Sequence, residues 1–258
     1  MMTELYTFLT LIKRDFAVFL PDYKDRFING LLWIVLVIGV FEYIMPQAGL
    51  VGFGVFIAVS SIGSWGIFNV MNSASEMIAD LEGERSITYY LTLPLPQWMV
   101  FARIAVSNAL QAIAISTMFI PISKLLLWEQ FNWAQVSWSK FVTIFVLANI
   151  FYGFFSLFLA SCIKNFKTVE NVWMRIVWPI FYLGCYQFRW SFVHTYSPKL
   201  AYVSLINPMV FIMEGIRGAI FGQEGSLPFL PCAVAIVIFT IIFGTIGIKR
   251  LQKRLDCL

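Results

Sequence analysis

The chain has 258 residues, of which 60% are hydrophobic and 12% are charged, and it carries a formal net charge of +4. Soluble domains usually contain about 25% charged residues, so the composition excludes a soluble globular protein and predicts a polytopic membrane protein with no sizeable soluble domain. The excess of basic residues is too small to indicate a nucleic-acid partner. Neither disulfide nor metal-site spacing is present among Cys162, Cys185, Cys232 and Cys257.

The first 26 residues are predicted to form a helix in the membrane interface, followed by a charged elbow. Apolar side chains recur at steps of three and four over residues 3–20, while charged residues and threonines take the other face. The charged residues inside this segment argue against a cleavable signal peptide. Pro21 is expected to end the helix, so that residues 22–26 form the elbow.

Six apolar stretches follow, and about 20 residues are enough for a helix to cross a bilayer. Pro46 is expected to end the first stretch. The second is rich in glycine and serine, which let helices approach closely in lipid. Five predicted spans occupy residues 27–188, at 27–45, 50–70, 98–127, 141–163 and 172–188, and a sixth at 227–248 precedes a tail at 249–258.

Residues 189–226, between the fifth and sixth spans, are too polar and too broken to cross the membrane. Asn207 suits an N-cap and Pro208 suits a first helical turn, so a short helix is predicted to begin there and to stop at Gly222. This helix is apolar enough to re-enter the outer leaflet. Glu214 and Arg217 lie three residues apart and therefore share a helix face, where they can pair.

The basic residues are distributed unequally between the two ends of the predicted spans. Thirteen of the 18 lysines and arginines fall at the end that holds both termini, and five fall at the other end. Because cytoplasmic loops carry an excess of basic residues, both termini are predicted to be cytoplasmic. We therefore expect a single all-α membrane domain over residues 1–258.

Residues 72–103 form a long polar interruption between two strongly apolar stretches. Charged residues crowd its middle, apolar residues recur there at helical spacing, and Pro94 and Pro96 then stop the segment. This pattern predicts a short amphipathic helix near residues 79–90 that contacts a soluble partner, and an ordinary solvated loop is the alternative. The charged residues are Asp80, Glu82, Glu84 and Arg85, and the apolar ones are Leu81, Ile87, Tyr90 and Leu91.

Two segments resemble the membrane subunits, or permeases, of type-2 ABC exporters (the ABC-2 type). The sequence Gly-Glu-Arg-Ser at residues 83–86, which follows acidic residues, and the exit Thr-Leu-Pro-Leu at residues 92–95 resemble the coupling helix of that family. The core departs from the family pattern, which has threonine where Arg-Ser stands here, and the exit has one extra leucine. The sequence Ile-Asn-Pro-Met at residues 206–209, with Glu214 and Arg217 behind it, resembles the segment before the family's last span.

The resemblance implies an interfacial helix, six transmembrane helices, a cytoplasmic coupling helix and a re-entrant helical hairpin before the last span, in the bacterial inner membrane. It implies that two copies of this chain form a pathway and that two copies of a separate ATPase subunit drive export of an amphiphile, such as a drug, a lipid or a lipid-linked glycan. ATP and Mg²⁺ would bind to the ATPase, because this chain has no GxxxxGK[ST] loop and is expected to be a transport subunit without a cofactor of its own. The implied ATPase contacts are Asp80, Leu81, Glu82, Glu84, Arg85 and Tyr90.

Polar residues at membrane depth are costly and therefore invite a functional interpretation. Four such residues could line a substrate route. Hydrogen bonding between helices explains each of them individually, and we favour that interpretation. They are Glu42, Asn69, Asn108 and Asn149.

Two other classes of function compete with transport. A lipid-modifying membrane enzyme would need a polar catalytic cluster. A single histidine, His194, argues against a His-ligated metal site, and its pairing with Ser60 or Ser61 in a hydrolase is less favoured than a packing role for the serines. An ion-coupled carrier would need acidic residues in mid-span, whereas Glu42 and Glu214 are predicted to lie at shallow depth.

Overall fold

The computed structural model describes residues 2–49, 52–128, 130 and 132–255, and every regular element within these ranges is a helix. Five of the described helical stretches are long and apolar enough to cross a membrane, or six if the bent pair α9 and α10 counts as one span. The prediction of an all-α chain with the helices of an integral membrane protein is therefore confirmed. The long helices are α1 (Met2–Ile38), α2 (Phe53–Glu82), α4 (Gln97–Leu126), α5 (Trp138–Cys162) and α11 (Phe229–Leu255).

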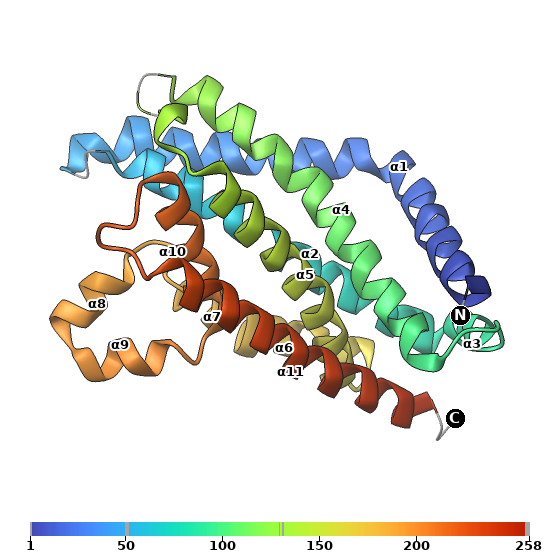
Figure 1. The fold of residues 1–258 in the computed structure, drawn as a ribbon. Coiled ribbons are helices and arrows are strands. Elements are labelled where there is room, and N and C mark those ends of the chain that lie inside the picture. The colour runs from blue at the N-terminus through green and yellow to red at the C-terminus, as the bar shows by residue number, and fades with distance from the viewer. Residues whose placement is uncertain (1, 50–51, 129, 131, 256–258) are drawn as a thin grey trace.

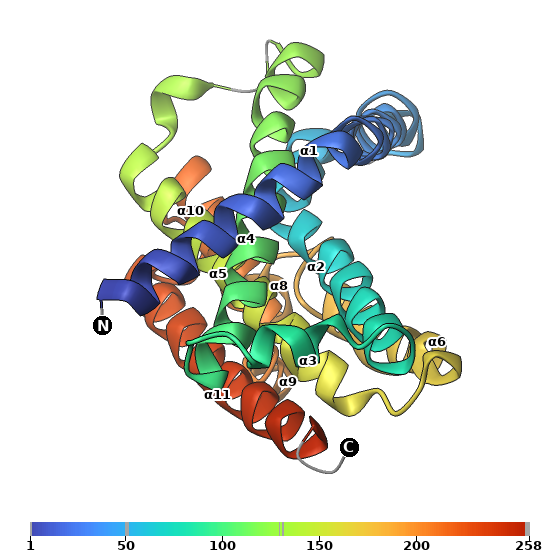
Figure 2. The same cartoon turned by 90° about the vertical axis from the view of Figure 1, so that its right-hand side faces the viewer.

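These helices form one bundle, in which α5 packs against α2, α4 and α11, and α1 packs along α4 (Figure 1). The short helix α3 (Ser86–Leu91) lies at one end of this bundle. The start of α1, the end of α2, the start of α4 and the end of α11 gather at the same end (Figure 1 and Figure 2). We call this end the α3 end, and it is the end to which the basic-residue count assigns the cytoplasm.

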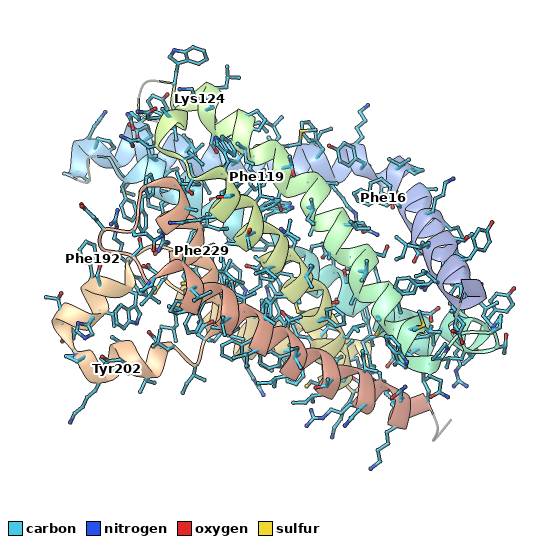
Figure 3. The ribbon with its side chains drawn as sticks, viewed as in Figure 1. Phe16, Phe119, Lys124, Phe192, Tyr202 and Phe229 are labelled. Atoms are coloured by element: carbon cyan, nitrogen blue, oxygen red, sulfur yellow. The ribbon has the colours of Figure 1, made fainter. Side chains whose placement is uncertain are left out.

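Helix α1 runs through Pro21 without a break, so the predicted helix end at Pro21 and the elbow at residues 22–26 are wrong. Proline lacks an N–H for the carbonyl of Ala17, and a proline inside a helix often bends the helix without ending it. The bend of α1 lies close to Phe16 (Figure 3). The first part of α1 consequently crosses in front of α4 when the bundle is viewed from its α3 end (Figure 2).

The stretch predicted as the fifth span, residues 172–188, is helical only as far as Tyr182. It contains α6 (Val169–Val172), a π-helical turn (Trp173–Val177) and α7 (Trp178–Tyr182). Residues 169–182 are about 21 Å long as a helix, whereas the hydrocarbon core of a bilayer is ~30 Å thick. This helix is therefore not among those long enough to cross a membrane by themselves, so a full helical span over residues 172–188 is not confirmed, and a crossing of the chain in this stretch stays a prediction.

Two short helices then project away from the α3 end (Figure 1), with Phe192 and Tyr202 exposed on them (Figure 3). They are α8 (Trp190–Tyr196) and α9 (Pro198–Ser204). The remaining helical turns are a π-helical turn (Gly39–Ile44) and the 3₁₀ turns Met45–Ala48, Trp133–Gln135 and Phe166–Thr168. Pro46 lies inside the first of these 3₁₀ turns, so the helical conformation continues beyond it to Ala48.

Helix α10 (Pro208–Ile220) begins where the sequence predicted. The Oδ1 atom of Asn207 accepts a hydrogen bond from the backbone N–H of Met209 at 3.0 Å, so Asn207 is the N-cap and Pro208 fills the first turn. The helix ends just before Gly222, whose φ of 94° suits glycine. Helices α9 and α10 meet at 99°, which is the geometry of a broken span or of a re-entrant loop.

Glycines allow the long helices to approach closely. A Cβ atom on Gly153 of α5 would collide with the carbonyl oxygen of Ala105 in α4, and one on Gly247 of α11 would lie 2.7 Å from the backbone nitrogen of Phe158 in α5. The ring of Phe158 packs on that of Phe243 with centroids 4.7 Å apart. Small residues and aromatic packing thus join α4, α5 and α11, as is typical of helices in lipid.

Candidate functional site

The segment predicted as one coupling helix is a corner between two helices. Helix α2 continues beyond the predicted span to Glu82, the chain turns at residues 83–85, and α3 begins at Ser86. The carboxylate of Asp80 accepts hydrogen bonds from the backbone N–H groups of Ser86 at 2.9 Å and Ile87 at 3.0 Å. Asp80 therefore fixes the direction of α3 by satisfying the free donors of its first turn, and the prediction of a continuous helix over residues 79–90 is wrong.

The side chains of the α2–α3 corner, residues 80–91, divide into buried and exposed sets. Leu81 is 5% exposed and packs in the core of this chain, so its predicted contact with a partner is wrong. Glu82, Glu84 and Arg85 are exposed, as predicted for contact residues. Tyr89 is 66% exposed, although the sequence analysis did not single it out.

Tyr90 faces into the chain, contrary to its predicted role as an anchor for a partner. The guanidinium carbon of Arg103 lies 4.3 Å from the centre of the Tyr90 ring, and that of Arg14 lies 5.0 Å from it. Arg14 also donates a hydrogen bond to the Tyr90 hydroxyl. Tyr90 therefore joins α3 to α1 and α4 through cation–π contacts.

A second link ties the corner to the turn that follows α5. The Oε1 atom of Glu82 accepts a hydrogen bond from the backbone N–H of Phe166 at 3.2 Å. At the same end, Arg254 of α11 donates to the carbonyl oxygens of Ile163 and Lys164 at 2.7 and 2.8 Å. The corner, the turn after α5 and the last helix are thus held together at the α3 end.

The predicted pair of Glu214 and Arg217 is present and completely buried, with 3.1 Å between Nη1 and Oε1. Glu214 also accepts hydrogen bonds from the backbone N–H groups of Trp190 at 3.1 Å and Leu227 at 3.3 Å. A buried ion pair is stable only when its remaining donors and acceptors are satisfied, and these contacts do so for the carboxylate.

The guanidinium of Arg217 is satisfied by oxygen atoms from two other parts of the chain. It donates to the Ser60 hydroxyl of α2 at 2.8 Å, and it lies 4.0 Å from the centre of the Phe56 ring. Its other acceptors are the carbonyl oxygens of Cys185, Tyr186 at 2.9 Å and Phe188 at 3.1 Å, all in the turn after α7. We call Ser60, Glu214, Arg217 and this turn the Arg217 cluster, and it joins α2, α10, the start of α8 and the segment just before α11.

Three of the predicted route residues make hydrogen bonds that stabilise helices. The Nδ2 atom of Asn69 donates to the carbonyl of Asn108 at 3.4 Å, and that of Asn108 donates to the Ser156 hydroxyl at 3.3 Å, so these residues connect α2, α4 and α5. Asn149 donates to the carbonyl of Phe145 in its own helix at 2.8 Å. The bonds of Asn69 and Asn108 agree with the favoured interpretation of bonding between helices, whereas Asn149 bonds within its own helix and its Oδ1 atom is buried without a partner among the described residues.

Glu42 is similar to Asn149 in that one of its side-chain oxygens lacks a hydrogen-bond partner among the described residues. Gln130 donates a hydrogen bond to Oε1, whereas Oε2 is buried without a hydrogen-bond partner among the described residues. Glu42 lies in the π-helical turn that follows α1.

His194 and the serines of α2 have separate partners. The hydroxyl of Ser61 lies 3.0 Å from that of Tyr186, and Ser60 accepts from Arg217. The ring of His194 packs on that of Trp190 at 5.1 Å. Each candidate for a Ser–His pair therefore has other contacts in this structure. Over the described part of the chain, no group of three or more His, Cys, Asp or Glu residues could hold a metal ion.

Arg14 and Arg103 are among the thirteen basic residues at the end assigned to the cytoplasm, and no local pattern predicts that they meet at one tyrosine. Arg103 is separated from Asp15, which it contacts, by 88 positions. Each arginine lies beside a long apolar stretch, and this position at the membrane boundary is the one sequence feature that indicates that the two arginines lie near each other. A scan against protein-family models and a search of curated proteins found no match to this chain.

Proposed function

We propose that this chain is the membrane-spanning subunit of an ATP-driven type-2 ABC exporter, and that a separate ATPase subunit docks on its α2–α3 corner. The observation that carries the proposal is the exposed surface of this corner, formed by Glu84, Arg85 and Tyr89. Asp80 and the buried Ile87 fix the backbone beneath it. A large exposed aromatic side chain, flanked by charged residues on a backbone that is held in place, is suited to anchor a protein partner.

The contact set differs from the one that the resemblance implied. Leu81 and Tyr90 hold the corner in place from within, and Asp80 caps α3. The proposed contacts with the ATPase are therefore Tyr89 as the anchor, with Glu84 and Arg85 as rim charges that favour one register. Glu82 belongs to the link with the turn after α5.

In this proposal, closure of two ATPase subunits around ATP and Mg²⁺ presses on the corner of each of two permease copies. Helix α2 has 30 residues and is therefore about 45 Å long, and it connects the corner with the Arg217 cluster. ATP binding can change the permease only if the ATPase binds its two conformations with different affinities. The cargo in this proposal is an amphiphile, and its chemical class is a drug, a lipid or a lipid-linked glycan.

The test is copurification of an ATPase from native membranes with a tagged copy of this chain. Mass spectrometry identifies whether the copurified protein contains a GxxxxGK[ST] loop, and ATP hydrolysis by the complex is measured. Loss of a well-packed aromatic anchor costs about 2 kcal/mol, so Tyr89→Ala should lower the affinity for the ATPase roughly thirtyfold.

Tyr202→Ala is the matched control, because Tyr202 is 62% exposed but lies on α9, away from the α3 end. This variant should retain the ATPase. The proposed docking site is refuted if Tyr89→Ala, combined with charge reversal at Glu84, leaves both copurification and ATP hydrolysis at the level of Tyr202→Ala.

A further inference from the structure

A polar cleft lies between α1, α2, α3 and α4 at the α3 end. It consists of two adjoining hollows, each with a volume of about 200 Å³. Both hollows are lined by Arg14, Arg103, Ile104 and Asn108. Neither arginine has a role in the proposed docking of an ATPase, so the cleft requires an explanation of its own.

One of the two hollows has more positive charge than its carboxylate neutralises, because Arg14 and Arg103 line it and Asp15 is the one acidic residue among its described lining residues. Arg14 and Arg103 share one counterion, since each lies 3.4 Å from the same oxygen of Asp15. The other hollow also contains Glu76 and Asp80, so it has no excess positive charge; there Asp80 caps α3, and Glu76 pairs with Arg26 at 3.2 Å. Two guanidinium groups with one shared carboxylate leave room for a second anion.

The buried part of Arg103 points to the same conclusion. Arg103 is only 5% exposed, and its Nε atom has no hydrogen-bond partner among the described residues. An unpaired donor on a buried charged group is costly, because the group has lost water without gaining an acceptor. An acceptor in the cleft would satisfy this donor.

The position of the cleft relates it to the membrane surface. After Arg103, α4 has no charged residue until Lys124, and after Arg26, α1 has none in its remaining length. The cleft therefore lies where two apolar helices begin. Val18, which is exposed, lines one of the hollows. Basic pockets between membrane helices at this depth suit the phosphate of a lipid headgroup.

We propose that this cleft binds the phosphate of an anionic phospholipid. Arg14 and Arg103 donate to the phosphate oxygens, and the Nε atom of Arg103 gains its missing acceptor. Asn108 and Gln111 in the wall supply further polar groups for the remainder of the headgroup. The acyl chains lie outside the cleft, along the apolar surface of α1 and α4. This proposal does not depend on an ATPase.

The test is native mass spectrometry of the full chain in detergent, titrated with phosphatidylglycerol and, separately, with phosphatidylcholine. We expect tighter binding of phosphatidylglycerol, because the choline cation is repelled by the net positive charge of the hollow beside Asp15. Hydrogen bonds to charged groups are strong enough that Arg14→Gln and Arg103→Gln should each weaken phosphatidylglycerol binding about tenfold. Arg14 is partly exposed, so Arg14→Gln tests the site even if the Arg103 variant does not fold.

Arg250→Gln is the control, because Arg250 is an exposed arginine near the end of α11 that does not line the cleft. Its phosphatidylglycerol binding should equal that of the unmodified chain. Equal binding by Arg14→Gln and Arg250→Gln, whether both are normal or both are weakened, overturns the proposal. Displacement of bound phosphatidylglycerol by an equal concentration of inorganic phosphate also overturns it, because the site would then recognise a free anion.

Discussion

Replacement of Arg217 by methionine tests whether the Arg217 cluster holds the bundle together. Methionine fills a similar volume but donates no hydrogen bond, so Glu214 remains as a buried charge without its partner. The carbonyl oxygens of Cys185, Tyr186 and Phe188 lose a donor at the same time. Breaking a buried ion pair by removing one partner costs about 3–5 kcal/mol.

The change of Glu214 to glutamine should cost less. The amide oxygen of the new side chain can still accept one hydrogen bond, and Arg217 keeps four oxygen acceptors from Ser60 and the turn after α7. Arg217 loses its counterion, but these four oxygens still surround its charge, so the expected cost is nearer the ~1.5–3 kcal/mol of a charged hydrogen bond, about half the cost of Arg217→Met. The expected order of stability is therefore the unmodified chain, then Glu214→Gln, then Arg217→Met.

Thermal unfolding in detergent, followed by tryptophan fluorescence, measures this order. A loss of 3–5 kcal/mol lowers the Tm of a chain of this size by roughly 10 °C. Arg250→Met removes an exposed arginine and should leave the Tm unchanged within about 2 °C. An equal Tm for Arg217→Met and Arg250→Met would refute the reasoning, as would a Glu214→Gln variant that is the less stable of the two cluster variants.

Two further predictions concern packing and topology. Gly153→Ala should lower the free energy of unfolding by about 1–3 kcal/mol, because its Cβ would collide with the carbonyl oxygen of Ala105. Gly39→Ala is the control and should leave stability unchanged, because no atom lies within 4 Å of the added Cβ. Equal Tm values for the two variants would contradict this account. The topology test uses a chain without its native cysteines, expressed in intact cells and treated with a membrane-impermeant thiol reagent. Lys199→Cys should be labelled from outside, and Lys164→Cys should be labelled only after lysis. Labelling of the position-199 thiol only after lysis would contradict the proposed orientation.

Local chemistry in the sequence predicted the start of α10 correctly. Asn207 caps it and Pro208 begins it, because both preferences depend on the backbone within one turn. The pairing of Glu214 with Arg217 was predictable for the same reason, since residues three apart share a helix face. Their complete burial depends on α2 and on the turn after α7, and no local pattern reveals those contacts.

The errors in the prediction arose where a local signal had two outcomes. Pro21 could end α1 or bend it, and packing of α1 along α4 accompanies the bend. Polar residues after Val70 suggested the end of the second span, yet α2 continues because its last turns remain packed in the core through Ile78 and Leu81. Helical periodicity cannot distinguish an apolar face that meets a partner from one that meets its own bundle.

The cleft at Arg14 and Arg103 was not predictable because its parts are distant in the sequence. Tyr90 is separated from Arg14 by 76 positions, and the contact requires the bend of α1 to bring its first part across α4. A sequence shows that two arginines adjoin apolar stretches, but it does not show that they share one carboxylate. Charge balance within a cleft emerges only once the fold is known.

Helix α2 connects the exposed corner to the buried Arg217 cluster, and its composition determines how a displacement would travel between them. Asp80 lies near one end and Ser60 near the other, so they are about 30 Å apart along the helix axis. Helices bend sharply at proline, at inserted π turns or at Gly/Ser pairs, and α2 contains no proline and no π turn but has the pair Gly63–Ser64 between Ser60 and Asp80. The hydroxyl of Tyr152 on α5 donates to the carbonyl of Gly63 at 2.8 Å, which gives α2 a lateral support near the cluster. In the proposed function, a push by the ATPase on the corner would therefore travel along α2 to the bond between Ser60 and Arg217, and from there to the turn after α7.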